Sequence, residues 1–224
     1  MPEDRTDQGN RSAFTSNWRL IEHSLTVGLV PRFITVGLCL IALACTIFVA
    51  GCSKGNGGEN SLHIKSTATG EKDLAVKSAY AFAVTKSFTD ATGKVTTAPS
   101  YRVYAANYDL DAANFAMTLD KPLTSDEHLR VVFSLVGEQG GNEKTPLKAG
   151  TYSAKADKFM KVEDVAIVSR KGATDSKVWL ERSTLTGNVK VSSVSGDTMS
   201  GDVDLSAGET SIKGSFTAKI LTRK

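Results

Sequence analysis

Two pairs of carboxylates are the residues of this chain whose spacing offers chemistry. Asp109 and Asp111 flank a leucine, and Asp202 and Asp204 flank a valine. Side chains two positions apart share one face of an extended segment, so each pair presents two acids on the same side. Such pairs can bind calcium through oxygen ligands, or act as the acid and base of a glycosidase. Solvated positions beside a core residue explain them equally well, and this is what we expect for both pairs.

Few residues after position 51 could support histidine-based catalysis or metal binding. His63 and His128 are the histidines there, and neither lies in a Gly-x-Ser-x-Gly nucleophile motif. Three or four closely spaced ligands, as a zinc site requires, do not occur. We therefore predict no catalytic residue, no metal site and no cofactor, in a protein that is not an enzyme. The alternative is an exported hydrolase that uses dispersed carboxylates, which requires one acidic pair in a cleft with raised pKa values.

An apolar segment near the N-terminus, residues 33–50, carries no charged residue. It is long enough to cross a bilayer, so an uncleaved membrane anchor is one interpretation. A basic residue, Arg32, precedes the segment and small residues end it, which is typical of a secretory signal peptide. The four residues Val49-Ala50-Gly51-Cys52 then resemble the lipobox of bacterial lipoproteins, with an aliphatic residue, two small residues and cysteine.

The lipoprotein resemblance implies a location. Val49, Ala50 and Gly51 would be read by the signal peptidase, which would cleave before Cys52. The resemblance also implies a diacylglyceryl group on the Cys52 sulfur and a fatty acyl group, such as palmitate, on the amino group that cleavage frees. Two or three acyl chains hold a protein on a membrane where one is marginal. Because Ser53 rather than aspartate follows the cysteine, the resemblance favours the outer membrane of a two-membrane cell, with the domain in the periplasm or at the cell surface.

The chain divides into three parts. Residues 1–51 form an N-terminal extension with the signal peptide, residues 52–61 a flexible tether rich in glycine and asparagine, and residues 62–224 one domain. All three cysteines lie at or before Cys52, so the domain has no disulfide. The formal charge of +3 gives no basic footprint for nucleic acid. We expect the membrane as partner through the anchor, and beyond it an envelope protein or a small apolar ligand.

Short runs of alternating apolar and polar residues fill the domain and predict strands. The clearest, residues 129–135, is interpreted as half-buried, and residues 115–119 predict another strand. Helices are expected only at 109–113 or 157–162. Turn residues recur roughly every eight to twelve positions, so we predict an all-β fold, a single antiparallel β-sandwich or β-barrel. The longest polar loop, residues 137–146, is the best candidate for mobility or partner contact.

Two further features concern packing and ligand binding. Gly201 and Gly214 recur at similar places in successive strands and indicate bulges or close packing. Aromatic residues gather between positions 80 and 115; they form core if they point inward, or a ligand site if they line an open barrel mouth. We expect the domain to be a non-enzymatic binding or envelope-structural module. A lipid-binding, lipocalin-like barrel is a further alternative, and it requires an apolar cavity.

Overall fold

A computed structural model describes residues 60–113 and 115–222 of the chain. Predictions about the signal peptide, Cys52 and the tether up to residue 59 lie outside these residues, whereas Ser61, the last residue of the predicted tether, lies in the first strand. No helix in the described part is long and apolar enough to span a membrane. The described residues form eleven strands and a single-turn helix: β1 (Ser61–Ser66), β2 (Gly70–Ala75), β3 (Ser78–Thr89), β4 (Val95–Ala106), α1 (Phe115–Thr118), β5 (Leu129–Val136), β6 (Gly150–Ser153), β7 (Lys161–Lys171), β8 (Thr174–Trp179), β9 (Thr186–Ser195), β10 (Thr198–Ala207) and β11 (Thr210–Leu221).

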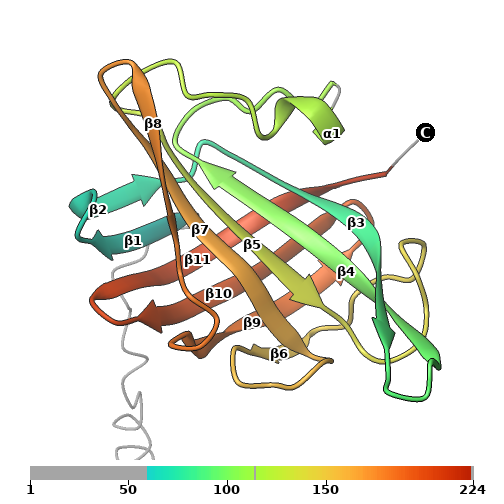
Figure 1. Cartoon of the computed structure of the whole chain (residues 1–224). Helices are drawn as coiled ribbons and strands as arrows, with labels where there is room; N and C mark the ends of the chain where they lie inside the picture. Colours follow the sequence, from blue (N-terminus) through green and yellow to red (C-terminus); the bar gives the residue numbers. More distant parts are fainter. Residues whose placement is uncertain (1–59, 114, 223–224) are drawn as a thin grey trace, which may run out of the picture. The chain divides into compact units, whose positions relative to one another are not determined.

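Eight of these strands close into a barrel (Figure 1). Their order around the ring is β3, β4, β5, β7, β6, β9, β10 and β11, and β11 returns to β3 through a short parallel pairing. A single parallel residue pair joins β6 to β7, and the remaining neighbours run antiparallel. The all-β prediction is confirmed, and of the two architectures considered the chain adopts the barrel, which leaves its ring of strands without an open edge.

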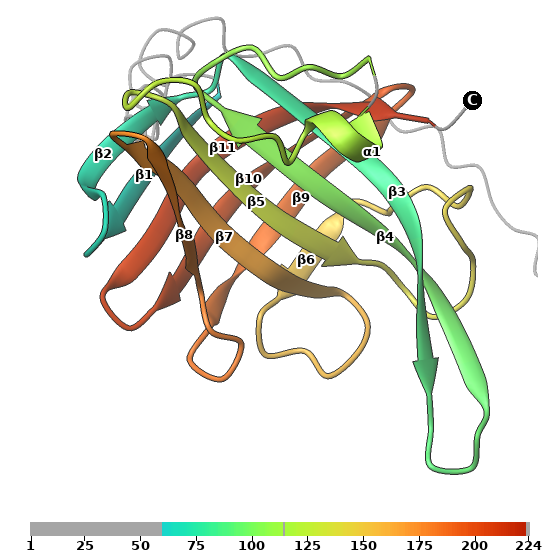
Figure 2. The ribbon, with the colours of Figure 1, turned by 45° about the horizontal axis from the view of Figure 1, so that its top comes forward.

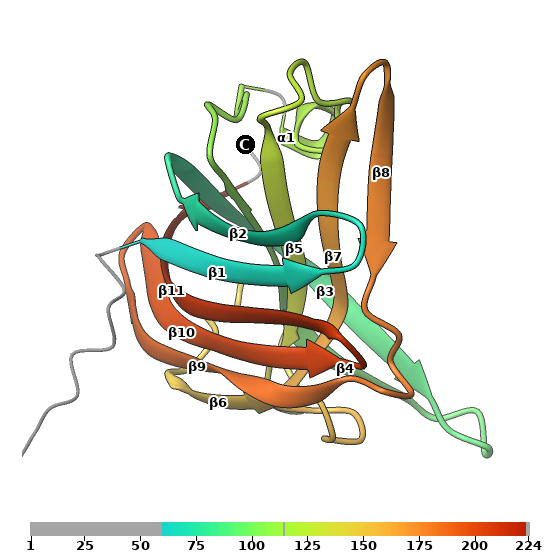
Figure 3. The same cartoon turned by 90° about the vertical axis from the view of Figure 1, so that its left-hand side faces the viewer.

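Three strands lie outside the ring. β1 pairs with the first half of β11 and carries β2 on its other side, while β8 pairs with the second half of β7 (Figure 3). β2 and β8 are therefore edge strands. Both have charged residues in their sequences, GEKDLA and TDSKVW, and charge on an edge opposes pairing with other chains. β2 has no alternation of apolar residues, which is why the pattern did not predict it.

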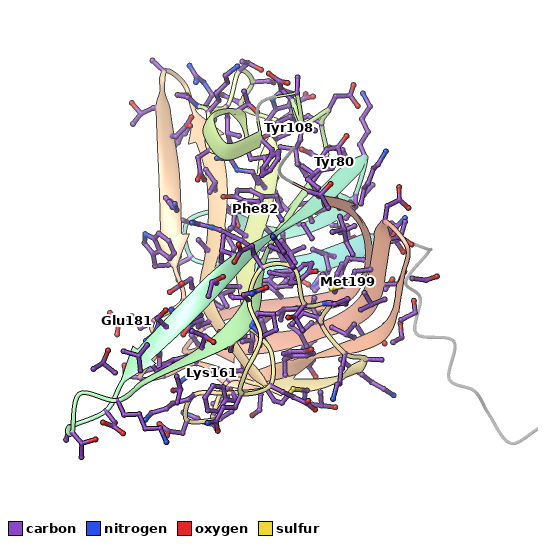
Figure 4. The ribbon with its side chains drawn as sticks, turned by 90° about the vertical axis from the view of Figure 1, so that its right-hand side faces the viewer. Tyr80, Phe82, Tyr108, Lys161, Glu181 and Met199 are labelled. Atoms are coloured by element: carbon purple, nitrogen blue, oxygen red, sulfur yellow. The ribbon has the colours of Figure 1, made fainter. Side chains whose placement is uncertain are left out.

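Side chains fill the middle of the barrel. Phe133 of β5 and Phe216 of β11 make an edge-to-face pair, with ring centroids 5.4 Å apart and planes at 76°. Tyr152 and Met199 are buried in the same core, and Figure 4 labels Met199 among the strands. Eight strands give an interior just wide enough for side chains, so this part of the barrel is packed rather than hollow.

Gly201 and Gly214 lie at a bulge and at a site of close packing, the two roles that the sequence indicated. The pairing of β10 with β9 shifts register between Ser200 and Gly201, which is a bulge. Gly214 pairs with Leu62 of β1 and has φ +138°; a Cβ there would overlap the carbonyl oxygen of Ser61 and lie 3.0 Å from the Leu62 Cα. Close packing of β1 on β11 therefore requires glycine at 214.

The long connection between β4 and β5, residues 107–128, covers the outer face of β3, β4 and β5. Beneath it lies a second apolar cluster, and Figure 4 labels three of its aromatic residues near α1. This cover buries Arg130 and Val132 on the outer face of β5. All eight residues of β5 are buried, so the half-buried interpretation is wrong. The cluster consists of Tyr104, Ala106, Leu110, Leu119 and Val132, packed by Tyr80, Phe82, Tyr108, Phe115 and Leu221.

The helical turn does not lie where the sequence predicted it. The strand expected at 115–119 is wrong, because the Leu119 N–H donates to the Phe115 carbonyl at 3.4 Å and both side chains contact the outer cluster. Residues four apart meet on one side of a helix. Residues 109–113 are not helical, because the carboxylate of Asp111 accepts the Ala113 N–H at 3.0 Å and forms a local turn instead.

The second predicted helix, 157–162, is also wrong. Residues 157–160 bend into β7, which begins at Lys161, and Val162 points into the barrel core. The β3–β4 hairpin, which contacts these residues through Phe88 and Phe159 with ring centroids 5.3 Å apart, extends well past the neighbouring strands (Figure 2). Asp90 closes its turn by accepting hydrogen bonds from the Thr92 hydroxyl and from the Lys94 and Thr92 N–H groups, and these bonds lower its pKa.

Candidate functional site: the barrel mouth

A cavity of about 740 Å³ opens at one end of the barrel. β11 stops pairing with β3 at Leu221 and Phe82, whereas β3 continues, and the two strands separate there. We call this space the mouth cavity. Its lining is Ala83, Val84, Thr85, Tyr101, Glu143, Lys144, Pro146, Val194, Gly196, Ile220, Leu221 and Thr222.

The apolar wall comes from inward positions of four strands. Ala83 of β3 lies opposite Tyr101 of β4, Val194 lies beside the β9–β10 turn, and Ile220 stands near the end of β11. Ala83, Val194 and Ile220 pack on the barrel core but are only partly buried. The small side chain of Ala83 leaves the room that a larger residue would fill.

Tyr101 gives this apolar wall a polar group. The residue is 5% exposed, and its hydroxyl makes no hydrogen bond to another described residue. Tyr152 differs, because its hydroxyl donates to the Lys148 carbonyl at 2.7 Å. Burial raises the pKa of Tyr101, so its hydroxyl keeps its proton at neutral pH and remains a donor. An apolar pocket with few polar groups is the usual form of a small-molecule site.

The polar loop 137–146 forms part of the rim. Two hydrogen bonds join Glu143 to Thr85 of β3. The Thr85 hydroxyl donates to the Glu143 carboxylate, and the Glu143 N–H donates to the Thr85 hydroxyl oxygen at 3.1 Å. The Gly140 N–H also donates to the Thr97 carbonyl of β4 at 2.7 Å. The loop that the sequence marked as a contact candidate is thus fastened to the strands that line the cavity.

The acidic pairs lie elsewhere. Asp202 and Asp204 are exposed on the outer face of β10, where Asp204 forms an ion pair with Lys213 at 3.3 Å. Asp109 and Asp111 line a separate pocket of about 370 Å³ in the 107–128 connection. The structure therefore brings neither pair to the barrel mouth.

Asp111 in that pocket does not have the raised pKa that the hydrolase alternative requires. Asp111 accepts the Ala113 N–H and forms an ion pair with Lys121 at 3.3 Å, and these interactions lower its pKa. Asp109 forms an ion pair with Lys77 at 2.8 Å. A general acid needs a raised pKa, so Asp111 departs from that role. The described residues also contain no group of three metal-ligating side chains.

The histidines occupy two different settings. His63 of β1 contacts Asp73 at 2.7 Å and Glu71 at 3.1 Å, both on β2, and the hydrogen bond to Asp73 raises its pKa. His128 is half-buried and stacks on Tyr108, with ring centroids 4.3 Å apart. Neither histidine lines the mouth cavity.

The sequence pointed to part of the lining of the mouth cavity, because the loop 137–146 and Tyr101, one of the aromatic residues between 80 and 115, were candidates for contact with a ligand or partner. It did not point to the apolar residues Ala83, Val194 and Ile220. The available signal was the run Ala79, Ala81 and Ala83, which places small residues at successive inward positions of β3. No family model, curated protein or solved structure matches this chain. The function of the chain must therefore be inferred from the geometry of the barrel and from the N-terminal sequence.

Proposed function

We propose that the chain is a lipid-anchored envelope protein whose barrel binds a small, mainly apolar ligand in the mouth cavity. The observation that supports this most directly is the cavity of about 740 Å³, which has an apolar wall and the hydroxyl of Tyr101, a group with no hydrogen bond to another described residue. Ligand pockets commonly have volumes of roughly 300–1,000 Å³. Because the core beneath is packed around Phe133 and Phe216, the ligand would stay at the mouth.

The anchor is supported by the lipobox-like residues Val49-Ala50-Gly51-Cys52. Peptide mass spectrometry of the membrane fraction tests it, with Cys52→Ser as the comparison. We expect an acylated peptide that begins at Cys52 and is missing from the variant. An unmodified Cys52 within an uncleaved chain would contradict the anchor and leave the ligand proposal to stand alone.

Ligand binding is tested with N-phenyl-1-naphthylamine, an uncharged dye whose fluorescence rises in apolar sites. A chain that begins at Ser53 contains every described strand. It can be studied without detergent, which would otherwise bind the dye itself. The double variant Ala83→Trp/Val194→Trp places two large side chains in the cavity and should weaken dye binding at least about tenfold. Val95→Trp, at a position 57% exposed on the β3–β4 hairpin, is the matched control and should bind like the wild type.

Thermal unfolding of each variant confirms that it is folded before binding is compared. Equal dye affinity in the filled variant and in the Val95→Trp control would contradict a site at the mouth. Tyr101→Phe removes the polar group and keeps the apolar wall. It should leave the affinity for the dye unchanged and lower the affinity for ligands that carry a hydrogen-bond acceptor.

A further inference from the structure

Arg130 is a buried cation without a buried anion. It lies at the start of β5 on the outer side of the barrel and is 4% exposed. Its Nη1 donates to the Tyr108 hydroxyl and to the Lys121 carbonyl, each at 3.1 Å. Its Nε is buried and has no hydrogen-bond acceptor among the described residues. Its Nη2 makes no hydrogen bond to a described residue either. No carboxylate of the described residues forms an ion pair with it.

Glu163, the other buried charge in the described part of the chain, and half-buried Arg170 are both compensated. Half-buried Arg102 forms no ion pair with a described residue, but its guanidinium lies 5.6 Å from the centroid of the Tyr104 ring. Arg170 forms ion pairs with Asp126 at 3.9 Å and Asp175 at 3.4 Å. The carboxylate of Glu163, with 4% of its side chain exposed, is paired with two basic residues. An unpaired buried charge is costly for a folded protein, so Arg130, which is 4% exposed and unpaired, indicates an anion that binds there.

The pocket of about 370 Å³ beside Arg130 supplies further donors. The Tyr108 oxygen accepts from Arg130, which leaves the hydroxyl hydrogen free to be donated. Tyr108 and His128, stacked at 15°, form one wall of this Arg130 pocket, and Thr124 adds a hydroxyl. The Tyr108 hydroxyl stays protonated, since burial raises its pKa.

The charges at the rim favour an anion as well. Asp109 and Asp111 line the pocket but are already paired with Lys77 and Lys121. These four charges cancel, and Arg130 remains as the excess cation of the lining. A planar guanidinium with unused N–H groups binds carboxylate or phosphate oxygens through short, charge-assisted hydrogen bonds.

We propose that the Arg130 pocket binds the oxyanion group of a small molecule, with Arg130 and Tyr108 as the donors. The pocket holds more than a bare ion, so the ligand is a small organic acid or a phosphate ester. This site lies on the outer side of the barrel and is separate from the mouth cavity, so it does not depend on the apolar ligand proposed there.

Isothermal titration calorimetry of the purified full-length chain tests the proposal. The probes are succinate for a carboxylate and inorganic phosphate for a phosphate group, both at fixed ionic strength in chloride. We expect saturable one-to-one binding of at least one probe, weakened at least about tenfold by Arg130→Gln. The probe that binds more tightly identifies the class of oxyanion.

Arg102→Gln is the matched control. Arg102 also has a buried Nε without an acceptor among the described residues, but it does not line the pocket, so its variant should bind like the wild type. Tyr108→Phe removes one donor with little change of shape and should weaken binding about three- to tenfold, which tests the site even if Arg130→Gln fails to fold. Three outcomes would each overturn the proposal: no saturable binding of either probe, equal loss in Arg102→Gln, or no loss in folded Arg130→Gln and Tyr108→Phe.

Discussion

Replacing Gly214 by alanine tests how β1 and β11 pack against each other. Gly214 has φ +138°, which residues with a Cβ rarely adopt, and its added Cβ would overlap the Ser61 carbonyl oxygen. The neighbouring Leu62 Cα would lie 3.0 Å away. Since the obstacle is backbone rather than a flexible side chain, β1 itself would have to move away from β11.

The cost has two parts. A residue held in a sparsely populated backbone region costs about 1–3 kcal/mol. Moving β1 would also lengthen hydrogen bonds of the pairing that joins residues 62–65 to residues 211–214, each worth about 1 kcal/mol. We expect Gly214→Ala to lower the free energy of unfolding by about 3 kcal/mol, or the melting temperature by roughly 10 °C.

Gly208→Ala is the control, because Gly208 also has positive φ, +57°, but a Cβ there would meet nothing within 4 Å. It should cost about 1 kcal/mol through the backbone alone. Urea unfolding of both variants, with the slope checked for constancy, measures the difference. If the two variants agree within about 0.5 kcal/mol, the reasoning about close packing at Gly214 is refuted.

Two further predictions concern ion pairs. Lys86→Met should destabilise the protein by about 2 kcal/mol, because it leaves the buried Glu163 carboxylate with one partner fewer. Lys213→Met breaks an exposed pair and should cost under about 1 kcal/mol. Equal midpoints of urea unfolding for the two variants would contradict this difference. His63 should titrate by NMR above its ordinary pKa of 6.5, and Asp73→Asn should move it back. Because that pKa is raised, the stabilisation is full below pH 6.5 and is lost as pH rises through the raised value; an unshifted His63 would contradict the contact with Asp73.

Strands could be predicted from the sequence where one face of the strand meets solvent. β10 shows this, with Val203 and Leu205 inward and Asp202 and Asp204 outward. Whether the strands form a sandwich or a barrel could not be predicted, because closure depends on β11 meeting β3, which lies more than a hundred residues earlier in the chain. Alternation along one strand carries no information on such a distant partner.

The segment 107–128 explains most of the remaining errors. Its apolar residues Phe115 and Leu119 pack on the outside of the barrel, so strand periodicity was the wrong guide there. The same cover buries Val132 and Arg130 on the outer face of β5, although Arg130 in the sequence is an ordinary charged residue of an alternating strand. The Arg130 pocket depends on this tertiary contact and has no local sequence signal.

The most direct test of a ligand site at the barrel mouth is a methyl NMR titration with N-phenyl-1-naphthylamine, using the chain from Ser53 with labelled alanine, isoleucine and valine. We predict saturable shifts of the Ala83, Val194 and Ile220 methyl groups, which lie at the cavity. Ile64, which pairs with Ile212 toward the other end of the barrel, should stay unchanged. Shifts confined to that end or to the outer cluster, or no shifts at all, would contradict binding at the mouth.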